Sequence, residues 1–378
     1  MGASGEVYRL AALEISLIPG LGPITQGKLC RARGELASWF SASVRELEML
    51  GISRDAAAAM HGRRYRPMAE EIADWAVREQ CLILARGSPG YPPLLEEISD
   101  PPLVLYCKGL MESLDASRVA IVGTRRPTYY GLQMAQGLAF DLGKRGVSIV
   151  SGLARGIDAA AHRGCLEAEG RTVAVFGCGI DVVYPREHRR LTEEISERGL
   201  LVSEFPPGTA PAPQNFPVRN RVISGLSMGT LIVEANEYSG SLITARLALE
   251  QNREVFALPG NLTSPQSFGP NYLIKQGAKL VQVWRDIVEE FPAEARAAIL
   301  TREDSGSGAK QPPEEVTGEE DAVLQLLDAG KATQFDRILQ GSGLGVPRLS
   351  EVLLDLEIRG FVRQVPGNLF IRAARPGE

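Results

Sequence analysis

The hydrophobic positions of this 378-residue chain follow different patterns in its first, middle and last parts. Residues 10–66 contain apolar stretches separated by short polar turns, which predict short helices. From Arg118 onward, short apolar runs alternate with stretches of helical periodicity. Such runs are typical of strands buried on both faces, in a parallel sheet covered by helices. The strands expected on this basis are Val119–Val122, Ser148–Ser151, Thr172–Phe176, Leu200–Ser203, Gly229–Val233 and Glu254–Ala257.

Two further apolar runs, Cys81–Ala85 and Leu103–Cys107, are separated by a proline-rich loop and predict strands added beside this sheet. The expected fold class is therefore α/β, with a Rossmann-like core of mixed or parallel strands. In such an open sheet, ligands bind beyond the carboxyl ends of the strands.

After Val288 the pattern gives way to a segment rich in Ser, Gly, Pro and Glu, which predicts a flexible acidic linker. A compact unit follows, with three helices and a hairpin around the turn Pro366–Asn368, and this combination predicts a winged helix. Its expected elements are helices 319–328, 334–340 and 347–359 and strands Phe361–Val365 and Leu369–Ile371. The chain is thus expected to comprise a helical domain (1–66), a Rossmann-like domain (67–292), a linker (293–317) and a winged-helix domain (318–378).

The segment Ile18–Pro23 reads Ile-Pro-Gly-Leu-Gly-Pro and lies between helical stretches. It resembles the turn of a helix-hairpin-helix, or SAM-like, domain, in which backbone N–H groups at a helix start can hold a DNA phosphate. A second, weaker copy begins at Leu50-Gly51-Ile52-Ser53. The alternative is a tight connection between helices with no contact to DNA, and the pattern leaves both open.

Composition and charge indicate which classes of partner the chain can bind. The chain is 44% hydrophobic and 23% charged, as in a globular protein, and its net charge of −5 counts against a nucleic-acid partner. However, residues 118–226 carry 14 Lys and Arg against 10 Asp and Glu, whereas residues 286–321 carry 3 against 11. The middle of the chain is therefore mildly basic and permits a nucleic-acid site.

The five cysteines are scattered and form no CxxC pair, which favours reduced thiols in the cytoplasm and argues against a zinc site. The first residues lack the basic and apolar regions of a secretory signal, and no apolar run is long enough for a membrane span. We therefore expect a cytoplasmic protein with no contact to a membrane.

The turns after the first expected strands are rich in glycine and arginine. Small residues let the backbone approach a ligand, N–H groups at helix starts attract anions, and the arginine fork suits a phosphate. The candidate phosphate-binding residues are Gly123, Thr124, Arg125 and Arg126 after the first strand and Gly152 and Arg155 after the second.

The familiar nucleotide signatures are missing from these turns. A dinucleotide site requires GxGxxG after the first strand, where this chain has GTRRPTYYG, and the chain contains no Walker P-loop. We therefore expect no cofactor and no metal ion, and instead a different ligand that carries phosphates.

The segment between the fourth and fifth expected strands combines an aromatic ring with a polar cluster: Phe216, Arg219, Asn220 and Arg221. Arginines beside an aromatic ring provide charge contacts to a backbone and a surface on which a base can stack, as in proteins that hold single strands. The alternative is that Arg219 and Arg221 pair with Glu204 or Glu234 and that Phe216 belongs to the core. The spacing favours neither.

Several other polar residues have both a structural and a functional interpretation. Glu234 ends a strand and is the best candidate for a catalytic carboxylate. His162 has no nucleophile beside it and is expected to pack or cap a helix. Asp158 and Asp181 follow glycine turns and are expected to cap helices or fix loops rather than bind magnesium. Ser239-Gly240-Ser241 is expected to cap the helix Leu242–Gln251, with a further anion site as the alternative.

Seven segments in register resemble the DNA-processing protein A family (DprA/Smf), and the similarity is continuous over roughly residues 80–290. The segments are VAIVGTRRPTYYG (119–131), SGLARGIDAAAH (151–162), AVFGCGIDVVYPREHRRL (174–191), SEFPPG (203–208), NFPVRNRVISGLS (215–227), LIVEANEYSGSLITARLALEQNREVFALPGN (231–261) and NYLIKQGA (271–278). The flanking helical and winged-helix domains fit the same architecture.

The resemblance implies a bacterial protein that binds single-stranded DNA and is not an enzyme. Members of that family protect incoming strands during natural transformation, displace single-strand-binding protein and help to load the RecA recombinase. They form homodimers through the Rossmann-like domain.

The motif positions imply the residues of the DNA site. By resemblance, the residues that bind phosphate are Gly123, Thr124 and Arg125, and those that line the same pocket are Arg155, Phe216, Arg219, Asn220 and Arg221. Thr124 stands where many relatives have serine, and it keeps the hydroxyl. Gln214 or Asn215 stands near the position at which some relatives place a lysine, so one charge contact is missing here.

The competing function is enzymatic. Rossmann-like phosphoribohydrolases also use a glycine-rich turn and a glutamate to cleave the N-glycosidic bond of a nucleotide, and Glu234 would be that glutamate. The segment 227–234 lacks the PGGxGTxxE string of that group, which favours DNA binding.

The winged helix also has two possible functions. Its third helix carries Arg348 and Arg359 together with Glu351, Asp355 and Glu357, so entry into a major groove would bring carboxylates close to phosphates. We therefore expect a protein contact or modest anchoring to DNA. The alternative is a transcription regulator, which would prefer a particular duplex sequence.

Overall fold

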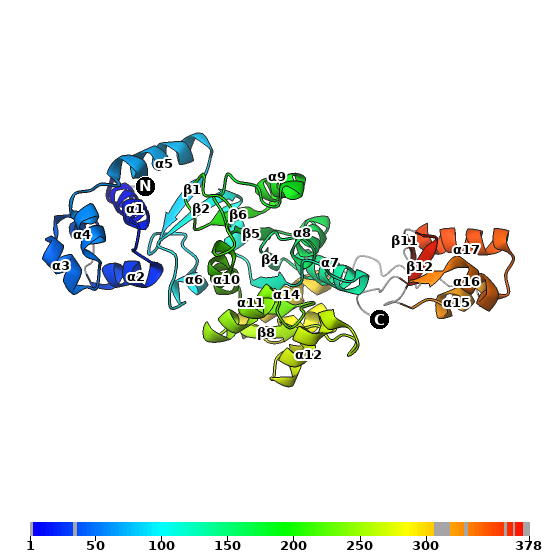
Figure 1. The fold of residues 1–378 in the computed structure, drawn as a ribbon. Helices are drawn as coiled ribbons and strands as arrows, with labels where there is room; N and C mark the ends of the chain where they lie inside the picture. Colours follow the sequence, from blue (N-terminus) through cyan, green and yellow to red (C-terminus); the bar gives the residue numbers. More distant parts are fainter. Residues whose placement is uncertain are drawn as a thin grey trace.

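The computed structural model describes residues 3–32, 36–305, 318–328, 332–358, 361–365 and 367–372. Figure 1 shows a central sheet with helices on both of its faces and the N-terminal helices, in blue, at one end of it. Within these residues, no helix is both long enough and apolar enough to cross a membrane.

The central sheet has nine strands in the order β1-β2-β6-β5-β4-β3-β7-β8-β9. All neighbouring strands from β6 to β9 in this order are parallel, whereas β2 is antiparallel to both of its neighbours. This confirms the α/β class and the two strands expected beside the core sheet. The strands are β1 (Leu82–Ala85), β2 (Val104–Gly109), β3 (Arg118–Val122), β4 (Ser148–Ser151), β5 (Thr172–Phe176), β6 (Leu200–Ser203), β7 (Gly229–Ile232), β8 (Glu254–Ala257) and β9 (Lys279–Leu280).

The helices around the sheet bury both of its faces. They are α6 (Pro93–Glu96), α7 (Tyr129–Lys144), α8 (Ile157–Glu167), α9 (Arg189–Arg198), α10 (Asn215–Gly225), α11 (Gly240–Glu250), α12 (Phe268–Lys275) and α13 (Trp284–Val288). In β3, Val119 and Ile121 lie in the core formed with α7 and α8, whereas Ala120 and Val122 lie in the core formed with α10 and α11. A strand covered on both faces is apolar at every position, which explains the continuous apolar runs.

The N-terminal residues form two helical hairpins that contact each other. Their helices are α1 (Ala3–Ser16), α2 (Pro23–Ala32), α3 (Val44–Met49) and α4 (Arg54–His61). Gly20 and Gly51 both have a φ of +82°, so each turn requires the left-handed conformation that glycine adopts readily. A Cβ atom at Gly20 would lie 4.0 Å from Ser53 Oγ, and one at Gly51 would lie 3.9 Å from Lys28 Nζ. Each turn therefore faces the second helix of the other hairpin.

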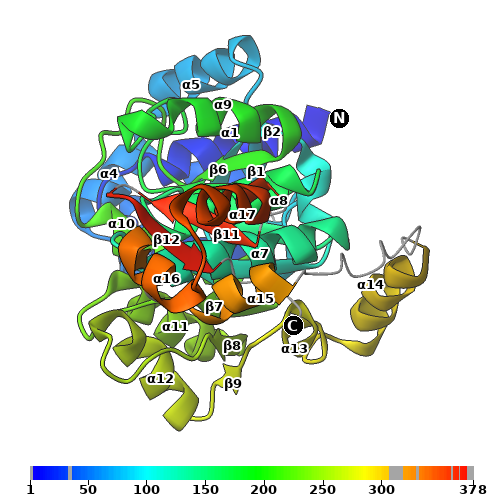
Figure 2. The same ribbon diagram turned by 90° about the vertical axis from the view of Figure 1, so that its right-hand side faces the viewer.

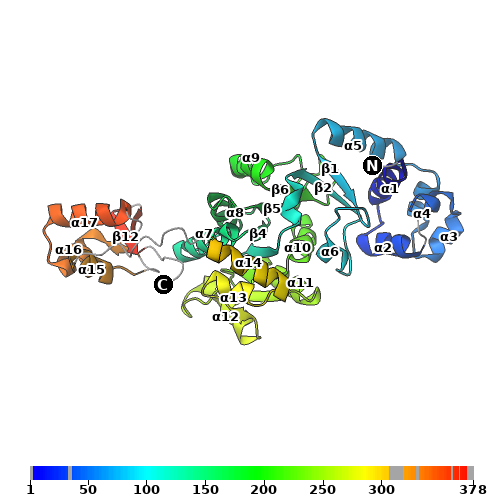
Figure 3. The ribbon, with the colours of Figure 1, turned by 180° about the vertical axis from the view of Figure 1, so that it is seen from behind.

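This helical region shares a hydrophobic core with the sheet. Leu13 and Ile15 of α1 belong to the same buried cluster as Ile83 of β1 and Tyr106 of β2. The expected boundary at residue 66 coincides with the start of α5 (Arg66–Arg78), which packs on α1 and β1. Figure 3 shows these helices beside the edge of the sheet that β1 and β2 form.

The first part of the expected linker is helical instead of flexible. Helix α14 (Ala293–Ser305) occupies it, because the segment is rich in alanine, glutamate and arginine and because Ile299 is buried against the core of α7 and α8. The remainder of the expected linker, residues 306–317, lies outside the described residues.

The C-terminal elements form a winged helix, as the sequence predicts. They are α15 (Gly318–Gln325), β10 (Thr333–Gln334), α16 (Phe335–Ser342), α17 (Val346–Ile358), β11 (Val362–Val365) and β12 (Leu369–Arg372). Leu324, Ile338, Leu349 and Phe370 pack in a core of their own, and the three strands pair in the order β10-β12-β11. The expected turn residue Pro366 and the helix residue Arg359 lie outside the described residues.

His162 is buried in α8, as expected for a residue that packs a helix. Its Nδ1 lies 2.7 Å from Thr172 Oγ1, and the Thr172 hydroxyl donates to the carbonyl of Ile149 at 2.7 Å. The hydroxyl proton is therefore used, so His162 Nδ1 carries the hydrogen and donates it. Burial lowers the pKa of His162 to about 3.

This buried imidazole predicts a loss of stability in acid. The unfolded chain takes up a proton at His162 near pH 6.5, whereas the folded chain does so only near pH 3. The free energy of unfolding should therefore fall as the pH drops from 6.5 toward 3, by up to about 1.4 kcal/mol per pH unit from this residue. Urea unfolding of the wild type and of His162→Gln should show a shallower pH dependence in the variant, and His61→Gln is the matched control. Equal slopes in all three proteins would contradict the prediction.

Candidate functional site

The order of the strands reverses at β3. Strand β3 lies between β4 and β7. The connection that leaves β3 and the connection that enters β7 therefore run on opposite sides of the sheet. In open α/β sheets this switch point leaves a crevice beyond the carboxyl ends of the strands. A groove of about 740 Å³ lies there, between the turn after β3, helix α10 and the turn from β7 to α11. We call it the switch-point groove.

The turn after β3 is held rigidly by backbone contacts. Thr124 N donates to the carbonyl of Glu234 at 2.7 Å, and Ile157 N donates to the carbonyl of Thr124 at 3.3 Å. Gly123 is required by this packing, since a Cβ atom there would lie 2.9 Å from the carbonyl oxygen of Glu234. The backbone that carries Arg125 is therefore fixed before a ligand arrives.

Arg125 and Phe216 meet at the centre of the groove. The Arg125 guanidinium lies 5.4 Å from the centroid of the Phe216 ring. Within the described residues, no carboxylate pairs with this exposed arginine. A cation over an aromatic face, with its N–H groups open to solvent, can bind a phosphate while the ring accepts a base.

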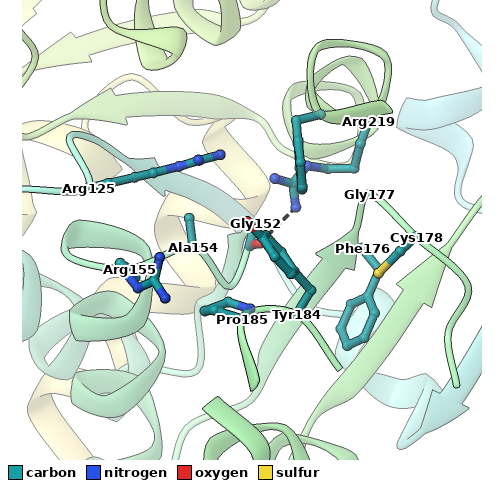
Figure 4. Close-up of a pocket in the computed structure, with 11 residues that line it drawn as sticks. Arg125, Gly152, Ala154, Arg155, Phe176, Gly177, Cys178, Tyr184, Pro185 and Arg219 are labelled. Carbon is teal, nitrogen blue, oxygen red and sulfur yellow. Dashed lines mark hydrogen bonds between the residues drawn. The ribbon is translucent and has the colours of Figure 1, made fainter. Parts of the chain in front are cut away.

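Tyr184 extends this aromatic surface, and the sequence pattern did not single it out. Its ring centroid lies 5.5 Å from that of Phe216, and it lines both the groove and a deeper pocket at one end, which Figure 4 shows. The only feature of the sequence that could have indicated Tyr184 as a site residue is its position, a few residues after the glycine turn that ends β5. A Cβ atom at Gly177 in that turn would lie 2.8 Å from the Phe216 ring, so the ring packs directly on the backbone.

Arg219 forms the floor of the same pocket. Only 5% of the residue is exposed, and its Nη1 donates to the carbonyls of Gly152, at 2.8 Å, and of Val175. Burial lowers the pKa of Arg219 to about 10, and nearby Asp158 opposes that shift. Arg219 thus ties the end of β4 to the end of β5 (Figure 4).

Arg221 does not reach the groove, although the sequence analysis placed it in the pocket. It is buried, pairs with Glu204 and lies 3.2 Å from Asp100. Burial raises the pKa of Glu204, and Arg221 opposes this. The physical reason is helical geometry: Arg219 and Arg221 are two residues apart on α10 and therefore point to different sides. For Arg221, the alternative of a pair with Glu204 is the observed arrangement.

The remaining predicted residues lie around the groove. Arg126 is exposed on its lip, and Asn220 lines it and accepts a 3.3 Å hydrogen bond from Arg219 Nε. Arg155 lines the deeper pocket and makes a two-pronged ion pair with Glu187, at 2.5 and 2.6 Å. Pro213, rather than Gln214 or Asn215, lines the groove.

Glu234 is not placed as a catalytic carboxylate would be. It is buried, and it accepts hydrogen bonds from Thr128 N at 2.8 Å and Thr128 Oγ1 at 2.5 Å. Thr128 is the N-cap of α7, so Glu234 joins β7 to the start of that helix. Glu234 is not among the described residues that line the groove.

The other polar residues have the structural roles that were expected. Asp158 accepts hydrogen bonds from Gly152 N and Ala154 N, and Asp181 accepts from Gly208 N, so both fix loops. Ser239 is the N-cap of α11, and its Oγ lies 2.7 Å from Ser241 Oγ.

The groove has a positive lining. Arg125, Arg126 and Arg219 face it, and Asp158 is the only carboxylate in its wall among the described residues. Asp158 is itself buried and hydrogen-bonded to the loop after β4. Fold and site together define a Rossmann-like protein whose switch-point crevice is lined by arginine and aromatic side chains, without the dinucleotide or Walker signatures.

Comparison with known proteins agrees with this class. Residues 82–292 match the family described as DNA recombination-mediator protein A, and residues 307–368 match the DprA winged helix domain. The chain belongs to the DNA recombination-mediator protein A family, which confirms the resemblance seen in the sequence.

Individual relatives cover most of the chain. Protein Smf of Escherichia coli K12 is 39% identical over 82% of this chain and 82% of its own length. The X-ray structure of DNA processing protein A from Streptococcus pneumoniae covers 77% of this chain and 99% of its own, with a TM-score of 0.65 and 33% identity. A structure of DNA processing protein A from Helicobacter pylori, described for its single-stranded DNA binding mode, covers 60% and 97%, with a TM-score of 0.50 and 34% identity.

Loss of a buried arginine and loss of an exposed arginine should change the stability by very different amounts. Arg221→Ala leaves the buried Glu204 without its partner and should lower the free energy of unfolding by about 3 kcal/mol. Arg125→Ala removes an exposed side chain and should change it by less than about 0.5 kcal/mol. Urea unfolding of both variants beside the wild type measures the difference, and an unchanged Arg221→Ala protein would contradict the assigned ion pair.

Proposed function

We propose that this chain binds single-stranded DNA in the switch-point groove. The observation that carries the proposal is Arg125, which presents an exposed guanidinium over the Phe216 ring with no acidic partner among the described residues. A phosphate at Arg125 leaves the attached base close to the rings of Phe216 and Tyr184. The Helicobacter pylori relative, whose structure is described for single-stranded DNA binding, supports the same ligand.

Other groove residues complete the contact in this proposal. Gly123, Thr124 and Arg126 line the groove in the turn after β3, and Asn220 faces the same space. The Thr124 N–H is already bonded to the carbonyl of Glu234 and the Arg126 N–H to Thr124 Oγ1, so the Thr124 hydroxyl and the Arg126 side chain are the groups that would contact the phosphates. Gly152 and Arg155 line the deeper pocket, where a phosphate would compete with Glu187 for Arg155. Arg219 lies at the floor of this pocket and bonds the carbonyl of Gly152, so it holds the pocket wall in place.

Single strands should bind better than duplexes. Stacking on Phe216 needs an unpaired base, which a duplex does not offer. The arginines contribute an electrostatic attraction to the phosphates of the DNA backbone, and this attraction weakens as the salt concentration rises.

The proposed biological role follows from the family. The chain would act in the cytoplasm, protect incoming single strands during natural transformation, displace single-strand-binding protein and load the RecA recombinase onto the DNA. The names of the curated relatives, DNA processing proteins of Bacillus subtilis and Streptococcus pneumoniae among them, support a role in DNA processing. RecA filament formation on strands covered by single-strand-binding protein should speed up when the chain is added, and unchanged kinetics would contradict this role.

We expect Arg125→Ala to weaken binding to a short oligothymidine and to reduce the salt dependence of binding. Each phosphate contact that is lost lowers the slope of log K against log salt by about 0.7 for a single strand. Fluorescence anisotropy at two salt concentrations measures both quantities. Arg78→Ala, which changes an exposed arginine on α5, is the matched control. Unchanged affinity and slope in Arg125→Ala would remove the groove as the DNA site.

The proposal also holds that the chain is not a nucleotide hydrolase, because Glu234 is buried and bonded to Thr128. Incubation with nucleoside monophosphates should therefore release no free base, as chromatography would show. Release of base by the wild type, abolished in a folded Glu234→Gln variant, would instead establish the enzymatic function.

We further propose that two copies associate through the Rossmann-like domain. Helix α12 and the edge strand β9, which Figure 2 shows together at one margin of the molecule, expose Phe268, Tyr272 and Leu280. The rings of Phe268 and Tyr272 are stacked with centroids 6.2 Å apart. An exposed apolar patch beside an unpaired sheet edge is typical of an interface.

Sedimentation velocity should detect a dimer that Tyr272→Asp dissociates, because the new charge would be buried between the copies. Leu249→Asp on α11 changes an equally exposed apolar residue outside the patch and should leave the dimer intact. A wild type that remains monomeric at all concentrations would exclude the dimer.

The winged helix fits a protein contact or modest anchoring to DNA better than the reading of a duplex sequence. Arg348 of α17 is already paired with Glu319 and Glu351, both at 2.8 Å. A preferred duplex sequence in a selection experiment with the whole chain would favour the transcription-regulator alternative.

A further inference from the structure

The switch-point groove continues well past Arg125 and Phe216. Its far half is formed by the turn from β7 to α11 and the first turn of that helix, together with Gln266. Helices α10 and α11 pack side by side (Figure 1), and residues from the first turns of both helices line the groove. None of the residues in this half belongs to the DNA site proposed above.

Tyr238 is the most prominent residue of the far half. It is 89% exposed, the second-highest value among the large hydrophobic side chains of the described residues, and its ring lines the groove instead of packing into a core. Among the described residues, no hydrogen bond, ion pair or ring contact involves the Tyr238 side chain.

The turn that carries Tyr238 is nevertheless fixed. Ser239 N donates to the carbonyl of Asn236 at 3.1 Å, and Ala235 N donates to the carbonyl of Gln266 at 2.7 Å. These two hydrogen bonds hold the ends of the turn, which reduces the backbone entropy that a stacking contact would cost.

The two halves of the groove differ in chemistry. The near half holds the three arginines, whereas the far half holds an aromatic ring, an aliphatic side chain that is 45% exposed (Ile243), hydroxyl groups and the amides of Asn236 and Gln266. The far half thus lacks the cations that phosphates need and offers the flat apolar surface and neutral hydrogen-bonding groups that bases need.

The geometry points to a second nucleotide subsite, in which Tyr238 stacks on the base that follows the one held at Phe216. Ile243 contacts the same base, and the amides of Asn236 and Gln266 face its polar edge. The inference rests on the proposed binding of single-stranded DNA and adds the direction in which the strand leaves Arg125, along α10 toward α11. It also makes the contact long enough to cover at least two consecutive bases.

Removal of single bases from a short strand tests this subsite. The probe is the tetranucleotide dT4, short enough to limit alternative registers, together with four analogues that each lack one base. In the wild type, loss of the base at either of two neighbouring positions should weaken binding by roughly 5- to 160-fold, the range expected for a base stacked on an aromatic ring. In Tyr238→Ala, intact dT4 should already bind more weakly by a similar factor.

Combining each protein variant with each base removal identifies which ring contacts which base. In Tyr238→Ala, removal of one of the two bases should cost nothing further, whereas removal of the other should cost as much as in the wild type. Phe216→Ala should show the opposite assignment, and Tyr238→Phe should restore wild-type behaviour because it keeps the ring. Tyr238 is exposed, so the two substitutions at this residue should leave the fold unchanged.

Two outcomes overturn the inference and can be told apart. If Tyr238→Ala binds dT4 as the wild type does while Arg125→Ala binds weakly, the second subsite is wrong, the proposed function stands, and Tyr238 is then free for a protein contact. If neither variant changes the affinity, the groove is not the DNA site and both proposals fail together.

Discussion

Arg219 is the residue on which the geometry of the groove depends. From α10 it bonds the carbonyl groups at the ends of β4 and β5, and Asp158 beside it holds the loop after β4. A buried guanidinium is costly to desolvate and is tolerated here because carbonyl oxygens and a carboxylate surround it. Phe216 lies three residues earlier on the same face of α10, so the contact that anchors Arg219 also fixes the ring beneath Arg125.

The arginines of this region therefore have different roles, set by burial. Arg219 and Arg221 are enclosed and bonded to backbone carbonyls or carboxylates, whereas Arg125 and Arg126 remain exposed. Only the exposed pair can exchange water for a phosphate without loss of an existing partner. A net charge of −5 is compatible with an anionic ligand, because the described part of the chain places a single, internally bonded carboxylate in the groove wall.

Much of the architecture was predictable because its cause is local. Parallel strands buried on both faces are apolar at every position, so the eight longer strands and the helices between them follow from short stretches of sequence. The two-residue strand β9 and the helix α14 were missed. Pairing with β8 defines the first, and contact of Ile299 with the core of the sheet stabilises the second, so neither has a sufficient local signal.

The α/β core, the winged helix and the segments that carry Gly123, Arg125 and Phe216 can be predicted from the sequence, because periodicity and glycine-rich turns are properties of neighbouring residues. Which polar groups remain available to a ligand depends on tertiary contacts. In the folded chain Arg221 pairs with Glu204, and Glu234 is hydrogen-bonded to Thr128. Tyr184 and Tyr238 line the groove. Partners and exposure arise from contacts between segments far apart in the chain, and no local pattern encodes them.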